Sequence, residues 1–295
     1  MIMSAPQNSL QSSKSVNTYR TVPGLIYICR LIGKDSSVPR VLHKHTDRVE
    51  VVFIVKGGGK YLIGDKHYNA NPGDVLIFNN NVVHDEITHT SDNSLIYSIG
   101  IDSQTWGKTL LKYEVITDFP PHIKCSDNFN LLVEYFNLLW NSESVDYMNS
   151  HAAFTELIEL LALSSRDASY SNASDVNNVF GEKILNYIEE NFQNEIFLED
   201  IADEFDANLF YIIHEFKKFT GYPPKKYIIL RRIGEAQSLL VSTKKSITEI
   251  ANSVGYSNIS NFNRIFKKVT GMAPSSYQNY LKKCIISRSG LFENH

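Results

Sequence analysis

The feature that most constrains the fold is an internal repeat in the last third of the chain. Residues Phe216–Tyr227 return fifty residues later as Phe266–Tyr277, with seven of twelve positions identical. In both copies two lysines precede a glycine, and a proline follows three residues after that glycine. Lysines suit the negative end of a helix dipole, the glycine ends the helix, and proline suits the first turn of the next helix. The repeat therefore predicts two similar helical units.

Each unit extends backwards into a second short helix. An Ile-Ala pair precedes a polar N-cap residue, with six residues from alanine to cap in both copies, and Asn and Ser are good caps. The pairs are Ile201-Ala202 before Asn208 and Ile250-Ala251 before Ser257. Two helices joined by a short turn are typical of a helix-turn-helix, so we expect such units at about 198–220 and 247–270. Asp206-Ala207 stands in the first turn where the second has Gly255-Tyr256, a difference that should weaken the first turn.

These paired units resemble the DNA-binding domain of AraC/XylS-type transcription regulators, over roughly the last hundred residues. The signature of that family is carried here by Ile250-Ala251, Gly255-Tyr256-Ser257, Phe262-Asn263-Arg264-Ile265-Phe266-Lys267 and Gly271-Met272-Ala273-Pro274-Ser275-Ser276-Tyr277. The resemblance implies a regulator of the activator type that binds a double-stranded DNA operator as a homodimer and contacts RNA polymerase. It also implies an N-terminal sensor for a small-molecule effector, such as a sugar.

The charge distribution separates the chain into two parts. From residue 207 to the end, 14 Lys and Arg stand against 4 Asp and Glu, whereas the first 206 residues hold 15 against 28. A net charge of +10 beside one of −13 indicates one domain for a polyanion and another for a different ligand.

Cysteine usage and hydropathy indicate a cytoplasmic protein. Cys29, Cys125 and Cys284 are far apart in the sequence and form no metal-binding motif, which is typical of a reduced compartment. The N-terminus is polar, without the apolar core of a signal peptide, and no apolar run of eighteen residues is present.

The N-terminal region has the pattern of short β-strands. The β-branched and aromatic runs, separated by Gly, Asn, Asp and Pro, are Leu25–Ile32, Glu50–Val55, Tyr61–Ile63, Val75–Phe78 and Leu95–Ile101. Many short strands with turns between them predict a sandwich or a small barrel.

Three histidines and a glutamate within this region form a second constellation. His43, His45, Glu50 and His84 follow the order of the two cupin motifs, which implies a cupin-like β-barrel whose mouth these side chains line. We expect them to line the effector pocket, with no cofactor. Two alternatives remain: they hold Fe, Mn, Ni or Zn, which imidazole and carboxylate suit, or His43 and His45 are surface strand residues.

Helical periodicity follows the β region. Phe129 to Trp140 and Phe154 to Leu161 have apolar residues three and four apart, which predicts two amphipathic helices. They either cover the barrel or, as the family resemblance implies, form the dimer contact, for which Leu132 and Phe136 are candidates. A stretch rich in Ser, Asn and Asp follows. We therefore expect a two-domain α+β chain: a sensing and dimerisation domain at 1–163, a flexible linker at 164–180, and an all-α DNA-binding domain at 181–295.

The second helix of each unit should read DNA. We expect the base-facing residues to be Phe210, Tyr211, Ile213, His214, Ser260, Asn261, Asn263 and Arg264, although core packing is an alternative for Tyr211. Lys217, Lys218, Lys267 and Lys268 should contact phosphates, although a lysine pair is ordinarily a solvated helix end. A long helix from Pro224 to Val241, with Lys225, Lys226, Arg231 and Arg232 near its start, should connect the units.

The sequence thus favours a DNA-binding, ligand-responsive transcription regulator that is not an enzyme. A second hypothesis makes the barrel a metal-dependent enzyme with an appended DNA-binding domain. A third, an architectural DNA protein without a sensor, is disfavoured by the acidic β region.

Overall fold

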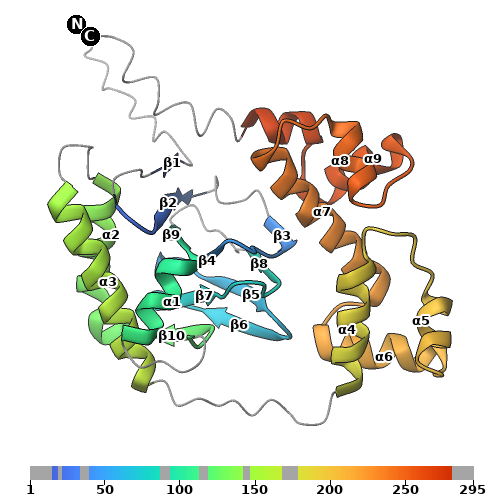
Figure 1. Ribbon diagram of the computed structural model, residues 1–295, viewed down its shortest axis with the longest axis horizontal. Helices are drawn as coiled ribbons and strands as arrows, with labels where there is room; N and C mark the ends of the chain where they lie inside the picture. The colour runs from blue at the N-terminus through green and yellow to red at the C-terminus, as the bar shows by residue number, and fades with distance from the viewer. Residues whose placement is uncertain are drawn as a thin grey trace, which may run out of the picture.

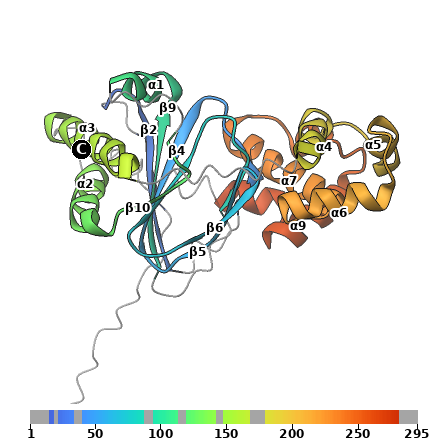
Figure 2. The same ribbon diagram turned by 90° about the horizontal axis from the view of Figure 1, so that it is seen from below.

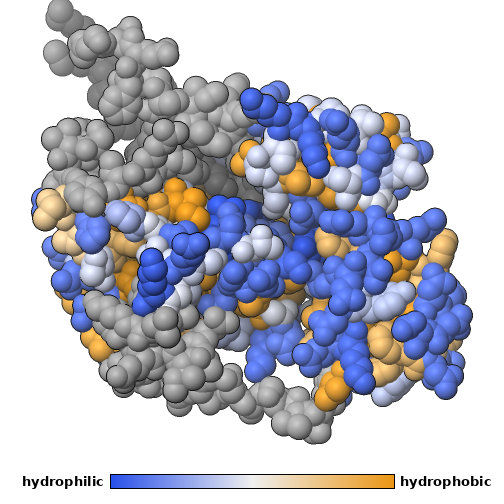
Figure 3. Space-filling model, viewed as in Figure 1, coloured by the Kyte–Doolittle hydropathy of each residue, from blue (hydrophilic) through white to orange (hydrophobic). Residues whose placement is uncertain are grey.

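The computed structural model describes residues 15–18, 22–33, 40–86, 94–112, 119–141, 147–167 and 179–280. A β domain lies between a pair of helices on one side and a helical domain on the other (Figure 1, Figure 2). In the view of Figure 3, hydrophilic residues cover most of the described surface of the helical domain, and hydrophobic residues form separate patches. Among these residues, none of the helices has the length and hydropathy needed to cross a membrane.

The described strands of the β domain form two antiparallel sheets. The larger sheet has the order β1-β2-β9-β4-β7-β10, and the smaller has the order β3-β8-β5-β6. The larger sheet contains β1 (Ser15–Thr18), β2 (Leu25–Ile32), β4 (Arg48–Lys56), β7 (Asp74–Phe78), β9 (Leu95–Asp102) and β10 (His122–Lys124). The smaller contains β3 (Arg40–His43), β5 (Gly59–Ile63), β6 (Lys66–Ala70) and β8 (His84–Glu86).

The two sheets face each other without closing into a barrel. Within the described strands, the hydrogen-bonded neighbours of β1 and β10 lie on one side only, so the edges of the larger sheet do not pair with the smaller sheet. The expected closed barrel is therefore corrected to two facing sheets. The expected class, a β domain followed by an all-α tandem helix-turn-helix domain, is confirmed.

Strand β4 shows how one segment serves two cores. Val51 and Phe53 pack against the helices behind the larger sheet, whereas Val52 and Ile54 pack between the sheets. Because successive side chains of a strand point to opposite faces, a strand buried on both faces is apolar throughout. This is why β4 is a continuous apolar run in the sequence.

Two helices, α2 (Phe129–Asn141) and α3 (Tyr147–Asp167), cover the outer face of the larger sheet (Figure 2). The ring of Phe136 stacks between those of Phe53 and Tyr97, with centroids 5.3 Å from each. Leu132 is fully buried in the same core. The suggestion that Leu132 and Phe136 form a dimer contact is therefore wrong, because these side chains attach α2 to the sheet. A further helix, α1 (Ser103–Lys112), and a 3-10 turn, η2 (Ser126–Asn128), complete this region.

The ends of the expected linker are helical. Helix α3 continues to Asp167, and the next helix, α4, begins at Val179, so the boundaries proposed at 163 and 181 each move by a few residues. Ser165 explains the first shift, because it is buried and its hydroxyl donates to the carbonyl of Ala162 within the helix. The rest of the expected linker lies outside the described residues.

The helical domain consists of two units joined by a long helix. The elements are α4 (Val179–Asn191), α5 (Leu198–Glu204), α6 (Leu209–Thr220), α7 (Pro224–Ser242), α8 (Ile247–Ser253) and α9 (Ile259–Thr270), and residues 274–280 are also helical. The expected units at 198–220 and 247–270 coincide with α5–α6 and α8–α9. One apolar core holds both units together and includes Ile212 and Phe216 of α6 and Phe262 and Phe266 of α9.

The turn of the second unit is one residue longer than that of the first. Asn208 caps α6 as expected, but α9 is capped by Asn258, not by Ser257. The buried phenylalanines of the two units are fifty residues apart and so are these two asparagines, so the extra residue lies in the turn. Asp206 adopts a φ of 46°, in the left-handed region that Gly255 occupies with a φ of 87°. The first turn thus has the same kind of backbone at a strained residue.

Candidate nucleic-acid interface and histidine cluster

The second helix of each unit exposes most of the side chains expected to face DNA. On α6, Phe210 is 81% exposed, Tyr211 is 51% exposed, and His214 is exposed. On α9, the exposed side chains are those of Ser260, Asn261, Asn263 and Arg264. Ile213 differs from the expectation, because it is half-buried against the core of the helical domain. It lies one position beyond the buried Ile212 and on the flank of the same stripe.

Helix α9 presents a polar pair suited to base edges. The guanidinium of Arg264 donates to the side-chain oxygen of Asn261 over 2.9 Å, one turn away on the exposed face. The backbone N–H of Asn261 donates to the cap residue Asn258, which fixes the start of the helix. Arginine pairs with the edge of guanine and asparagine with that of adenine, each through two hydrogen bonds. The first turns of α9 therefore hold both types of base-reading side chain side by side.

Tyr211 combines the two roles that were considered for it. Its ring stacks on that of Phe180 in α4, with centroids 5.3 Å apart and planes 30° apart, while half of its surface stays exposed. The stacking restricts the ring to one orientation at the surface of α6. Phe210 beside it is a large apolar side chain with little burial, which is a costly arrangement unless another surface covers it.

Both lysine pairs lie exposed in the last turn of their helices. Lys217 and Lys218 precede Gly221, which has a φ of 76°, and Lys267 and Lys268 precede Gly271, which has a φ of 84°. Their charges complement the negative ends of α6 and α9. The same positions leave the ammonium groups accessible to phosphate.

Two arginines of α7 have structural roles that the sequence analysis missed. Arg231 is 1% exposed and pairs with Glu189 over 3.1 Å and with Glu235 over 3.2 Å. Arg232 donates to the backbone carbonyls of Phe192, Asn194 and Gly255. Arg232 thereby ties the end of α4 to the turn of the second unit. Neither side chain is placed to contact DNA.

The structure brings the three histidines and the glutamate together in the interior of the β domain. His43 ends β3, His84 begins β8, and Glu50 lies on β4 of the opposite sheet. One potential ligand atom from each of His43, His45, Glu50 and His84 lies within 4.8 Å of those from the other three, and all four residues are buried. The suggestion that His43 and His45 are surface residues is therefore wrong. We call these four residues the histidine cluster.

Burial controls the charge of the cluster. It lowers the pKa of His84 to about 3 and holds that of His43 well below its ordinary value. Burial alone would raise the pKa of Glu50, but the hydrogen bond from His45 and the charge of Arg40 hold it below its ordinary value. At neutral pH His43 and His84 are thus uncharged imidazoles around a carboxylate.

The strands that carry these histidines also contact the helical domain. At β3, the backbone N–H of Val41 donates to the side-chain oxygen of Gln237, and a Cβ at Gly234 would overlap the carbonyl oxygen of Leu42. At β8, the carboxylate of Asp85 accepts from the hydroxyl of Tyr222 over 3.3 Å. The β domain therefore packs directly on α7 and on the loop before it.

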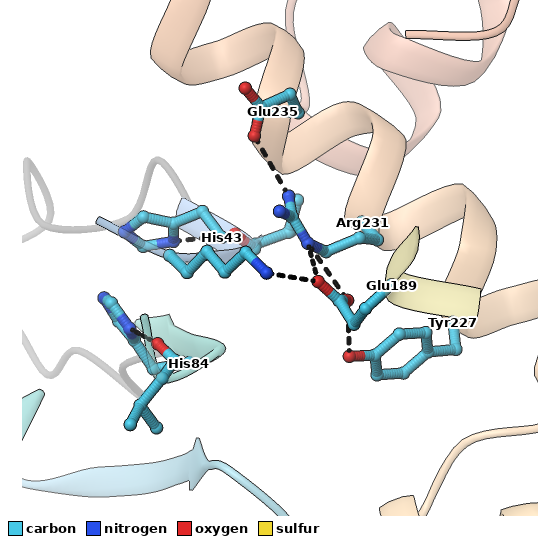
Figure 4. Close-up of polar contacts among 9 residues, drawn as sticks. His43, His84, Glu189, Tyr227, Arg231 and Glu235 are labelled. Carbon is cyan, nitrogen blue, oxygen red and sulfur yellow. Dashed lines mark hydrogen bonds and ion pairs between the residues drawn. The ribbon is translucent and has the colours of Figure 1, made fainter. Parts of the chain in front are cut away.

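A buried ion network crosses this boundary (Figure 4). Glu189 accepts from the guanidinium of Arg231 and from the hydroxyl of Tyr227, and it pairs with Lys44 over 3.1 Å. Lys44 follows β3 directly, whereas the other three residues belong to the helical domain. One carboxylate thus receives bonds from both domains.

Comparisons with known proteins agree with this architecture. Residues 27–178 match the family of AraC-like ligand binding domains, and residues 201–280 match a helix-turn-helix domain family. The uncharacterized HTH-type transcriptional regulator YdiP of Escherichia coli (strain K12) is 25% identical over 261 residues, which cover 85% of each chain. The HTH-type transcriptional activator RhaS of Mannheimia succiniciproducens is 26% identical, over 79% of this chain and 87% of that protein.

Solved structures similar to the chain include both partial and nearly full-length matches. The C-terminal domain of the two-component response regulator yesN from Fusobacterium nucleatum is 32% identical, over 33% of this chain and 95% of that one, with a TM-score of 0.32. ToxT from Vibrio cholerae O395 is 19% identical, over 92% of this chain and 99% of that one, with a TM-score of 0.45.

The two matched domains define a transcription regulator that combines a ligand-binding domain with a DNA-binding helix-turn-helix domain. The chain belongs to the AraC family of such regulators. Its relatives are named as transcriptional regulators, which favours regulation over the metal-dependent enzyme considered as an alternative.

Proposed function

We propose that α6 and α9 enter two adjacent major grooves on one face of the operator. The observation that carries this proposal is the repeated unit with an exposed second helix on each side of α7. The nineteen residues of α7 span about 28 Å at about 1.5 Å per residue, close to the ~34 Å between successive major-groove faces. Because α7 belongs to the core of both units, it holds the two reading helices at a fixed separation.

The two reading helices have different chemistry, so we infer different roles for them. Asn261, Asn263 and Arg264 of α9 supply hydrogen bonds to base edges, and Ser260 lies beside them. Phe210 and Tyr211 of α6 favour apolar contact with thymine methyl groups, with His214 at the same surface. The phosphate contacts come from Lys217, Lys218, Lys267 and Lys268.

We further propose that the β domain transmits ligand binding to α7 through β3 and β8. A ligand can shift the regulator only if it favours one arrangement of the two domains over another. The effector site includes the histidine cluster, and its nearest route to the DNA-binding domain is the contact of Leu42 with Gly234. The domain contact leaves the exposed faces of α6 and α9 uncovered, so the ligand acts on orientation.

A second copy of the chain is the partner we propose for α2. Leu131 and Leu138 are seven residues apart, so they share one face of that helix, and each is 44% exposed. No charge separates them on that face, so two copies of α2 can pair around a twofold axis. Leu131→Glu combined with Leu138→Glu should give monomers in ultracentrifugation, with Val241→Glu on exposed α7 as the control. Unchanged dimers in the double variant would remove this interface.

We also infer that the regulator is an activator that contacts RNA polymerase in the cytoplasm, where its operator lies. The support is the relative RhaS, which is named as a transcriptional activator. In vitro transcription from a promoter with the selected operator measures the sign. Repression at every operator position would contradict the activator role.

Selection of bound sequences from random DNA tests the proposal as a whole. We expect a motif with two boxes about one helical turn apart, since each unit reads one major groove. Footprinting on the recovered sequence should show protection of both boxes on the same side of the duplex. Recovery of a single box, or no enrichment at modest salt, would contradict the two-groove arrangement.

A further inference from the structure

We propose that His43, His45, Glu50 and His84 bind one divalent first-row transition-metal ion, and that the ion fixes the contact between the β domain and α7. This inference rests on the proposed function and names the class of ligand that the histidine cluster takes.

The protonation of His84 directs a lone pair into the cluster. Its Nδ1 lies 2.9 Å from the carbonyl oxygen of Val82, and a carbonyl can only accept, so Nδ1 carries the proton. The other ring nitrogen, Nε2, therefore has a free lone pair. It is buried without a hydrogen-bond partner among the described residues, a state that ordinarily costs free energy. A metal ion would use that lone pair.

His43 has the same arrangement on the neighbouring strand. Its Nδ1 lies 3.0 Å from the carbonyl oxygen of Val41, so this ring too is held with Nε2 as the unprotonated nitrogen. The bond from Nδ1 to a backbone carbonyl is the usual outer contact of a metal-binding histidine, because it fixes both the tautomer and the ring orientation. The rings of His43 and His84 have centroids 4.2 Å apart, so both face one small space.

The spacing of the donor atoms suits an ion and excludes a larger ligand. At about 2.1 Å from a metal, neighbouring ligand atoms lie about 3.0–3.4 Å apart and opposite ones about 4.2 Å apart. His45 Nε2 and Glu50 Oε2 are already 3.2 Å apart, and all four donors are within 4.8 Å of one another. A contraction of a few tenths of an ångström would complete the site, whereas a sugar does not fit among these atoms.

The donor set and its surroundings select the class of metal. Three imidazoles and one carboxylate suit Zn, Fe, Ni and similar ions and disfavour Ca and Mg, which take oxygen ligands. Ser98 donates its hydroxyl to Oε1 of Glu50, which leaves Oε2 directed at His45. The carboxylate is thereby oriented from outside the cluster, as ligating carboxylates are.

The alternation of β3 and β8 connects this site to the DNA-binding domain. His43 and His84 point into the space between the sheets, and they are partners in the register of β3 and β8. Their neighbours in sequence point the other way: Leu42 lies against Gly234, and Asp85 accepts from Tyr222. An ion that draws the two histidines together also fixes the backbone of both contact strands.

Metal binding to the stripped full-length chain tests the site itself. Protein freed of metal with a chelator is titrated with Zn²⁺, and with Co²⁺ as a visible-absorption probe. We expect one equivalent to bind, with Co²⁺ bands that report nitrogen and oxygen ligands. His84→Gln should weaken binding by more than the roughly 10–100-fold that the loss of an outer partner costs. Glu50→Gln, which keeps the shape of the side chain, is the second variant if His84→Gln fails to fold. His151→Gln on the exposed surface of α3 is the matched control.

Two outcomes overturn the site: no stoichiometric binding by the wild-type chain, or unchanged binding in both cluster variants. Hydrogen exchange tests the coupling, because metal should slow exchange of the Val41 amide and of α7 in the wild type but not in Glu50→Gln. Unchanged exchange with metal bound would overturn the coupling. Random-sequence selection with the metal-free chain keeps the proposed function separate, since two boxes recovered there support DNA reading even when no metal binds.

Discussion

Gly234 of α7 lies directly against the carbonyl oxygen of Leu42 on β3, so closely that a Cβ at position 234 would overlap it. A helix-interior glycine ordinarily weakens a helix, so alanine here should help α7 by up to about 1 kcal/mol. The neighbour, however, is backbone and cannot rotate away. The sign of the substitution therefore reports whether the two domains are in contact.

Gly234→Ala should destabilise the chain by about 1–3 kcal/mol, because overpacking at backbone forces the strand and helix apart. The measurement is the urea midpoint of the β domain and α7, followed by hydrogen exchange. Gly107→Ala in α1 is the matched control, since a Cβ there meets nothing within 4 Å. It should be neutral or stabilising. Equal effects of the two substitutions would show that the contact with Leu42 does not form in solution.

Arg231→Ala should cost about 3–5 kcal/mol, because it leaves Glu189 buried without its main positive partner. Chemical denaturation followed by circular dichroism measures the loss. Arg264→Ala on the exposed face of α9 serves as the control and should leave the unfolding free energy unchanged. A cost below about 1 kcal/mol at Arg231 would mean that the pair is solvated, as exposed ion pairs are.

Asp206→Gly should stabilise the first helix-turn-helix unit by about 1 kcal/mol, because it relieves a left-handed backbone that glycine adopts without strain. The comparison is Asp203→Gly, which places glycine within α5 and should destabilise by a similar amount. Thermal unfolding of both variants decides. If Asp206→Gly lowers the midpoint, the carboxylate contributes more to the turn than the strain costs.

Sequence patterns identified what is local and missed what depends on docking. The β-branched run of β2 and the polar N-cap of α6 are specified by neighbouring residues and were located correctly. Strands β3 and β8 are short and rich in polar residues, so their strand form depends on pairing with each other. The order of histidines indicated a common site, but its burial depends on how the two sheets face each other.

The contact between the domains left only a weak signal in the sequence. Tyr227, Arg231 and Gly234 are four and three residues apart, so they fall on the buried face of α7. A charged residue and a glycine on such a face indicate an ion partner and a close backbone neighbour. No local rule says that these partners are Glu189 and Leu42, because the partners come from other parts of the chain.

Lys267→Ala should weaken binding to the selected operator and to random DNA equally. A phosphate contact carries no sequence information, and its loss should reduce the slope of log affinity against log salt by about one. Fluorescence anisotropy at several salt concentrations measures both quantities. Lys244→Ala, an exposed lysine outside both reading helices, is the control for net charge. A loss restricted to the specific operator would contradict the phosphate role.

Arg264→Ala should cost about 1–3 kcal/mol on the selected operator and relax the preference at one base pair, because a paired contact with a guanine edge is lost. Asn261 loses its hydrogen-bonded neighbour in this variant, so Asn261→Ala in the same assay separates the two contributions. Repeating the random-sequence selection with Arg264→Ala identifies the base pair that is read. An equal loss on operator and random DNA would show that Arg264 contacts only phosphate, and direct reading would then fall to Asn261 and Asn263.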